Sequence, residues 1–182
     1  MIFEETLLQG VWMITTTPRE DERGSFARTF CADEFLAYGI DHRVAQCSLS
    51  TTPQRGTLRG IHLQQAPHGE TKLVQCVRGA IFDVAVDLRA GSPTFGQHIS
   101  TTLSDSNRRA FLLPPGVGHG LLTLEANAAV WYQMSVPYVP GVATGVRWDD
   151  QTLNIDWPTS RPRVSKQDQQ LPGLDHWVPA PD

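Results

Sequence analysis

The sequence predicts an all-β protein, a jelly-roll barrel with a few short helices. Two observations favour this fold class. Residues 82–88 and 130–136 alternate apolar and polar side chains with the period of two that is typical of strands with one buried face. The 15 glycines and 13 prolines are spread along the chain as turn signals between short apolar segments. Many short strands separated by turns indicate a sandwich or a barrel, and the mouth of a jelly roll offers a concave site.

The remaining elements are expected around these two strands. Shorter apolar segments predict further strands at residues 11–16, 44–50, 73–77, 96–103, 110–113 and 120–124. Arg78-Gly79 fits a hairpin turn between the strands at 73–77 and 82–88. A short helix is expected over residues 32–38, ended by Gly39, and residues 104–109 fit a single helical turn. The Pro-rich polar segment from about residue 158 is expected to wrap the surface as loops and short helices.

Length and composition indicate one globular domain over residues 1–182, with 40% hydrophobic and 19% charged residues. The net charge of -4 argues against a nucleic-acid partner, although a few arginines suffice to bind a phosphorylated small ligand. Three cysteines without a CxxC pair favour a reducing compartment. The acidic N-terminal segment is unlike a signal peptide, and no apolar run reaches the ~20 residues of a membrane span. We therefore expect a cytoplasmic protein without a membrane partner.

Titratable side chains occur in two otherwise apolar segments. Residues 58–64 contain Arg59 and His62 and are followed by Lys72, and residues 114–120 contain His119. Charged groups are rarely buried without a partner or a task, so these segments suggest a site inside the barrel.

His62 is the candidate general base, because a histidine titrates near neutral pH. A lone strand histidine is more often a hydrogen-bonded core residue, and the charged neighbours of His62 favour the functional interpretation. A base of this kind needs a carboxylate on its other ring nitrogen, and Asp168 is the candidate. Metal ligation is the rival interpretation. Because residues 62–64 read His-Leu-Gln rather than the HxH of metal-binding jelly rolls, we expect no metal.

Lys72, Arg59 and Tyr132 are the other candidates for chemistry. Lys72 is either a solvated residue at a strand end or a fixed positive charge aimed at an oxygen that becomes negative during a reaction. Arg59 could serve the same end or clamp a phosphate. Tyr132 shares a strand face with Val130 and Met134, so it is either a core aromatic or a phenol that acts as an acid.

Seven segments, in order along about residues 20–170, resemble the dTDP-4-dehydrorhamnose 3,5-epimerases of deoxysugar biosynthesis. They are residues 21–24, 56–64, 72–74, 82–89, 92–96, 115–120 and 155–158, which include Arg-Gly-Ile-His-Leu-Gln and Asp-Val-Ala-Val-Asp-Leu-Arg. The resemblance implies a metal-independent cupin-type jelly roll that works as a homodimer, with no cofactor, on a dTDP-linked 4-keto-6-deoxy sugar.

The resemblance also implies a role for particular residues. His62 would be the base, Asp168 its partner and Tyr132 the opposing acid, whereas Lys72, Arg59 and His119 would line the site near the sugar and diphosphate. The remaining expected substrate-binding residues are Arg23, Gln46, Ser50 and Tyr138. Loss of a proton beside a ketone gives an enolate, which Lys72 or Arg59 would stabilise, and inversion requires reprotonation from the opposite face of the ring.

Three residues depart from the family pattern in regions expected to touch substrate: Arg28 and Ala143 replace glutamates, and Ser48 replaces an asparagine. Inversion at a single centre of a variant nucleotide sugar and binding without turnover therefore stay open. The segments at residues 59–62 and 82–89 favour the epimerase over a 3,4-ketoisomerase, and the missing HxH disfavours a metal-dependent cupin oxygenase. For the dimer, the strand from Val11 could pair across a two-fold axis, because exposed strand edges invite pairing.

Overall fold

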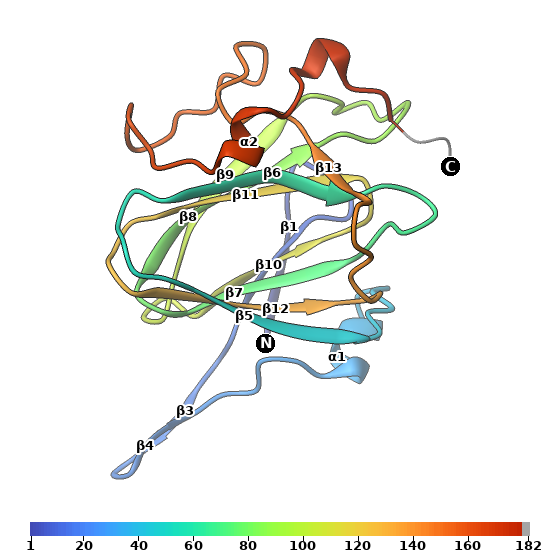
Figure 1. Cartoon of the computed structure of the whole chain (residues 1–182). Coiled ribbons are helices and arrows are strands. Elements are labelled where there is room, and N and C mark those ends of the chain that lie inside the picture. Colours follow the sequence, from blue (N-terminus) through green and yellow to red (C-terminus); the bar gives the residue numbers. More distant parts are fainter. Residues whose placement is uncertain (180–182) are drawn as a thin grey trace.

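Two antiparallel β-sheets packed face to face enclose the interior of the protein (Figure 1). The computed structural model describes residues 1–179. The first sheet has the order β1 (Ile2–Glu5), β2 (Trp12–Thr15), β10 (Arg109–Leu113), β7 (Lys72–Arg78), β12 (Ala128–Met134) and β5 (Gln46–Thr52). The second has the order β13 (Ala143–Gly145), β6 (Leu58–Gln64), β11 (Val117–Thr123), β8 (Ala80–Asp87) and β9 (His98–Ser104). This architecture confirms the predicted jelly roll.

Alternate side chains of both sheets meet in a core at one end of the barrel. Val74 and Cys76 on β7, Phe111 on β10 and Leu121 on β11 are buried there, together with Tyr132 on β12 at its margin. The period of two places one side of each strand inward. The same period therefore brings the polar residues of β5, β6, β7, β11 and β12 into the other part of the interior, where the site lies.

The strand β8 is buried on both faces, which corrects the prediction that residues 82–88 form a strand with one buried face. Asp83 and Asp87 point into the barrel interior and are 0% exposed, and Val84 and Val86 on the opposite face are equally buried. The second face is covered by the C-terminal segment, whose buried side chains Trp157, Leu174 and Trp177 pack on it. Alternation alone therefore could not tell which face of β8 meets the interior.

Two predicted connections and one predicted edge are also different in the structure. Gly79 does not close a hairpin, because β7 and β8 belong to different sheets and the chain crosses between them at this residue. The strand β11 begins at Val117, so His119 lies within a strand. The strand from Val11 is β2, which lies between β1 and β10 and is not a free edge.

The helices are short, as expected. The helix α1 (Ala32–Leu36) precedes Gly39, whose φ of +74° allows the chain to turn away, and it packs Phe35 against the outer face of the first sheet. Residues 104–109 make a single turn closed by a hydrogen bond from the Arg108 N–H to the Ser104 carbonyl. The C-terminal segment contains α2 (Lys166–Gln169) and a 3-10 turn (Leu174–His176) and lies over the second sheet (Figure 1).

A two-stranded ribbon protrudes from the barrel. Strands β3 (Arg19–Asp21) and β4 (Gly24–Phe26) pair only with each other, and Figure 1 shows them extending away from both sheets. Phe26, which pairs with Arg19 at the base of this ribbon, is 78% exposed.

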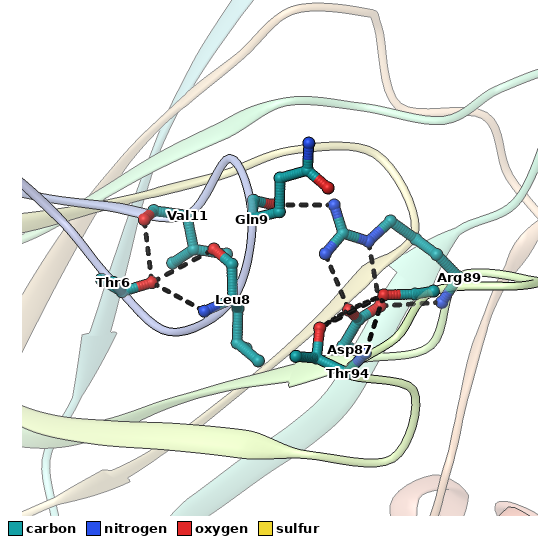
Figure 2. A network of polar contacts seen from close by, with 8 residues as sticks. Thr6, Leu8, Gln9, Val11, Asp87, Arg89 and Thr94 are labelled. Carbon is teal, nitrogen blue, oxygen red and sulfur yellow. Dashed lines mark hydrogen bonds and ion pairs between the residues drawn. The ribbon is translucent and has the colours of Figure 1, made fainter.

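Asp87, at the end of β8, is the centre of a polar network that joins the loop after β8 to the loop between β1 and β2 (Figure 2). Its carboxylate accepts hydrogen bonds from the Arg89 backbone and guanidinium, from Ser92 Oγ at 2.6 Å and from Thr94 Oγ1 at 2.6 Å. Arg89 Nη1 in turn donates to the carbonyl of Gln9 at 2.8 Å, in the loop between β1 and β2. Burial alone would raise the pKa of Asp87, but these hydrogen bonds outweigh it and hold the pKa well below its usual value.

Candidate active site

A cavity of about 630 Å³ opens between the two sheets beside the C-terminal segment. Eight of the ten residues predicted from the sequence to form the site line it: Gln46, Arg59, His62, Lys72, His119, Tyr132, Tyr138 and Asp168. They come from both sheets, from the segment after β12 and from α2. Ser48 and Ala143, which depart from the expected family pattern, line the same cavity.

His62 and Asp168 are in direct contact. His62 Nε2 lies 2.8 Å from Asp168 Oδ1, although the two residues are 106 positions apart in the chain. Burial alone would raise the pKa of Asp168, but hydrogen bonds from His62 and from the Gly60 N–H outweigh it and lower the pKa. An ionised Asp168 requires a proton on His62 Nε2, which leaves Nδ1 as the basic nitrogen. Within residues 1–179, Nδ1 makes no hydrogen bond, so it is available to a substrate.

Local structure fixes both members of this pair. Ser165 caps α2, and its Oγ accepts a hydrogen bond from the Asp168 N–H at 3.0 Å, which sets the direction of the aspartate. Asp168 Oδ2 accepts the Gly60 N–H at 3.1 Å. Gly60 has a φ of +118°, and a Cβ at this position would lie 2.6 Å from the Gly120 Cα and the His119 carbonyl oxygen. Only glycine therefore allows β6 to approach β11 closely enough at this point.

His119 has its own carboxylate partner, which sequence reasoning missed. His119 Nε2 lies 2.8 Å from Asp83 Oδ1, and both side chains are buried. Burial raises the pKa of Asp83, and the nearby His119 opposes this shift. Asp83 Oδ2 has no hydrogen-bond partner within the described residues. In the sequence, Asp83 is one polar residue in an alternating strand, and nothing distinguished it from a residue on an exposed face.

Tyr132 lies beside this second pair. Its ring meets the His119 ring edge to face, with the ring centroids 6.0 Å apart. Burial is the main cause that raises the pKa of the phenol well above its usual value, and the carboxylate of Asp83 adds to it. The hydroxyl therefore stays protonated at neutral pH and can donate a proton into the cavity.

The cationic side chains of the cavity are held in different ways. Lys72 Nζ lies 2.8 Å from Glu70 Oε1, and Glu70 Oε2 accepts a hydrogen bond from Gln64 Nε2 at 3.1 Å. Arg59 donates to Thr52 Oγ1 at 3.3 Å and has no carboxylate partner in residues 1–179. Glu70 and Gln64 line the cavity but were not predicted as site residues. Glu70 lies in the loop that leads into β7, two residues before Lys72, and the sequence held no signal that distinguished it.

Two glutamines hold the segment after β12. Gln46 Oε1 accepts the Tyr138 N–H at 3.0 Å, and Gln64 Oε1 accepts the Val139 N–H at 3.0 Å. Gln46 Nε2 donates to Ser48 Oγ at 3.2 Å. The Tyr138 ring thereby stands at the margin of the cavity, more than half exposed, where it offers a flat surface to a ring system.

Arg23 and Ser50 are not among the residues that line the cavity. Arg23 lies on the protruding ribbon between β3 and β4, where its guanidinium pairs with Asp21. Arg28, the third departure from the family pattern, pairs with Glu34 at 2.6 Å, also away from the cavity. Their contacts with a substrate stay predictions from the resemblance.

Within residues 1–179, no three or more His, Cys, Asp or Glu side chains gather in a group that could hold a metal ion. No helix in this part of the chain is long and apolar enough to cross a membrane.

The chain is similar to known epimerases over almost its full length. It is 46% identical to a dTDP-4-dehydrorhamnose 3-epimerase of Streptomyces niveus, over 89% of this chain and 78% of that one. It is 42% identical to a dTDP-4-dehydrorhamnose 3,5-epimerase of Mycolicibacterium smegmatis, over 96% and 86% of the two chains. A crystal structure of the Bacillus anthracis dTDP-4-dehydrorhamnose 3,5-epimerase with TDP and PPi bound superposes with a TM-score of 0.92 at 36% identity, covering 94% of this chain and 98% of that one.

The family model described as dTDP-4-dehydrorhamnose 3,5-epimerase matches residues 5–176. This match spans the barrel, the paired histidines and the C-terminal segment that supplies Asp168. The chain therefore belongs to the dTDP-4-dehydrorhamnose 3,5-epimerase family of isomerases, as its sequence motifs indicated.

Proposed function

We propose that this protein inverts C3 and C5 of dTDP-4-keto-6-deoxyglucose to give the 4-keto-rhamnose product. The observation that carries the proposal is the orientation of His62. Its Nε2 is bound by Asp168, and its Nδ1 has no hydrogen-bond partner among the described residues, in a cavity that Lys72, Arg59 and Tyr132 also line. Such a site can take a proton from carbon, stabilise the negative charge that results and return a proton.

Each side chain has a task in this reaction. His62 Nδ1 takes the proton from the carbon next to the 4-keto group, while Asp168 stabilises the imidazolium that forms. The electron pair moves onto the ketone oxygen, where the Lys72 ammonium stabilises the enolate. Return of a proton from the opposite face of the ring inverts the centre, and the hydroxyl of Tyr132, which lines the cavity, is the proposed donor. No oxidation occurs, so the reaction needs no redox cofactor.

The nucleotide end of the substrate is proposed to lie toward Arg59, Gln46 and Tyr138. Arg59 is a guanidinium without a carboxylate partner in the described residues, and such a group suits a diphosphate. The exposed ring of Tyr138 suits stacking on a base. The TDP-bound relative from Bacillus anthracis supports a nucleotide in this cavity, since the two chains superpose closely.

A second candidate function is inversion at C3 alone. It is favoured by the 46% identity to the Streptomyces niveus 3-epimerase, compared with 42% for the 3,5-epimerase of Mycolicibacterium smegmatis. Ser48 and Ala143, which line the cavity, are where this chain departs from the family pattern and are the residues most able to alter the fit of the sugar.

A cytoplasmic homodimer is the proposed working form. The cysteines Cys31, Cys47 and Cys76 are all free thiols, as a reducing compartment requires. Leu49, Val77 and Phe26 are exposed apolar side chains on the first sheet and the ribbon, and a second copy would cover them. Arg23 lies on the same ribbon, so the substrate contact expected of it is reached only in the cavity of a partner subunit.

Proton NMR of dTDP-4-keto-6-deoxyglucose in deuterated water tests the function. Deuterium at both C3 and C5, with the rhamno product trapped by a 4-keto reductase, is the expected result. Deuterium at C3 alone would contradict the double inversion and indicate the single-centre reaction. Exchange at neither carbon, with dTDP binding intact, would leave a binding protein and contradict the proposal.

A further inference from the structure

We propose that Glu70 is a positioning residue for Lys72 and holds the ammonium in the orientation that stabilises the enolate. The negative charge of Glu70 also offsets the positive charge of Lys72, so the pair adds little to the attraction of the cavity for anions. This inference rests on the proposed function, because it assigns Lys72 to the ketone oxygen. It concerns a carboxylate in the wall of a cavity that is proposed to receive a diphosphate. A negative charge in such a place opposes the binding of an anion, so its presence points to another task.

The contacts of Glu70 account for both of its oxygens. Oε1 pairs with Lys72 Nζ at 2.8 Å, and Oε2 accepts from Gln64 Nε2 at 3.1 Å. The Glu70 and Lys72 side chains are 9% and 15% exposed, so solvent screens this pair less than a surface ion pair. A carboxylate that is bound at both oxygens is held in one orientation, and its contact with the Lys72 ammonium restricts the position of that ammonium.

The lysine keeps part of its donor capacity. An ammonium has three N–H donors, and one of them is directed at Glu70. The other two are free to meet an oxygen in the cavity, to which Lys72 contributes a wall. A lysine without this tether has four rotatable bonds and many orientations, and a displacement of about 1 Å at a reacting atom costs up to 10²-fold in rate.

Glu70 also separates binding from catalysis in the cavity. Because its charge offsets that of Lys72, the ion pair contributes little to the long-range attraction of an anionic ligand. Arg59, which has no carboxylate partner in residues 1–179, is left to attract the diphosphate. Removal of the Glu70 charge should therefore lower kcat and leave nucleotide affinity equal or stronger.

Gln64 connects the pair to the rest of the site. Its side chain is 2% exposed, its Nε2 donates to Glu70, and its Oε1 accepts the Val139 N–H at 3.0 Å. The lysine, the glutamate and the segment that presents Tyr138 are thereby joined in one chain of contacts. Glu70→Gln breaks this chain, because it replaces one of the two accepting oxygens with an NH2 donor, which would face the Lys72 ammonium or the Gln64 Nε2 donor.

The experiment compares Glu70→Gln and Glu70→Ala with the wild type and with Glu125→Gln, which alters an exposed glutamate. The measurements are kcat and KM from deuterium exchange at C3 of dTDP-4-keto-6-deoxyglucose, and the Kd of dTDP alone. We expect kcat to fall about 10-fold or more in both Glu70 variants. We expect KM and the dTDP Kd to stay within about 3-fold of the wild type or to decrease. Glu125→Gln should match the wild type.

A Lys72→Met background separates a positioning role from a structural one. If Glu70 acts through Lys72, Glu70→Gln causes no further loss of kcat in that background. An equal loss with and without Lys72 would overturn the proposal, and so would unchanged kcat in both single variants. A wild-type protein that exchanges no deuterium would instead overturn the proposed function, and the role of Glu70 with it.

Discussion

His62 and His119 are direct cross-strand partners on β6 and β11. The Nε2 of each ring lies 2.8 Å from the Oδ1 of a different aspartate. The two aspartates differ in environment. Hydrogen bonds lower the pKa of Asp168, whereas complete burial raises the pKa of Asp83. Two similar pairs on adjacent strands are thus suited to different tasks. The His62 pair is built around a stable carboxylate, and the His119 pair stands at the inner end of the cavity beside Tyr132.

Asp168→Asn tests the pairing of His62 directly. The amide keeps the shape of the side chain but cannot fix the Nε2–H tautomer, so Nδ1 is no longer reliably the basic nitrogen. We expect proton exchange at both carbons to fall by about 10²- to 10⁴-fold, with the dTDP Kd unchanged. Exchange rates are measured by NMR and binding by calorimetry. Wild-type exchange in this variant would remove Asp168 from the mechanism.

Tyr132→Phe tests the proton donor. Because the phenol stays protonated at neutral pH, its loss should remove the acid that completes inversion at C5. We expect reprotonation at C5 to slow at least ~10²-fold, with a smaller effect on deuterium entry at C3. Integration of the C3 and C5 proton signals over time gives both rates. The assignment fails if the two inversions are retained equally.

Asp87→Asn should destabilise the fold without touching the cavity. The variant leaves Arg89 without its charged partner, and we expect the free energy of unfolding to fall by about 2–4 kcal/mol at pH 7. Since the folded state lowers the pKa of Asp87, its contribution is present above the usual value of 3.8 and is lost as pH falls further. Urea denaturation measures the change, and Asp41→Asn, at an exposed ion pair, serves as the control and should stay within ~0.5 kcal/mol. Equal stability of both variants would contradict this role.

His42 should make stability depend on pH. It is buried against Phe30 and Phe35, and neither ring nitrogen has a hydrogen-bond partner in residues 1–179. Burial lowers the pKa of His42 below 6.5, so the unfolded chain binds the proton more readily and the free energy of unfolding decreases as pH falls below 6.5.

The matched variant is His42→Leu. Its stability relative to the wild type should be constant above pH 7 and should increase by at most ~1.4 kcal/mol per pH unit toward pH 5. His176→Gln, at an exposed histidine, controls for titration at the surface. Parallel pH curves for the wild type and His42→Leu would show that His42 titrates alike in the folded and unfolded chains.

The sequence predicted the barrel and the prominence of His62 from local signals, whereas the pairing of His62 with Asp168, 106 positions away, came from the resemblance to the family. Period-two alternation marks strands, and a histidine beside an arginine in an apolar strand is conspicuous whatever it contacts. Asp83 could not be predicted as the partner of His119, because which face of β8 meets the interior depends on the packing of Trp157 and Trp177 from far along the chain. Gly79 was misread for a related reason, since a turn residue does not reveal whether the next strand joins the same sheet.

The contact between His62 and Asp168 also has a consequence for the synthesis of the chain on the ribosome. A ribosome that has just added His62 must add 106 more residues before Asp168, the partner of His62, is in the chain. The barrel strands all precede α2 in the chain, so a nascent protein has its sheets available while the base is still unoriented. Catalytic competence therefore arrives last, when the C-terminal segment closes over the second sheet, and a premature stop between β13 and α2 yields a barrel that has every strand and no oriented base.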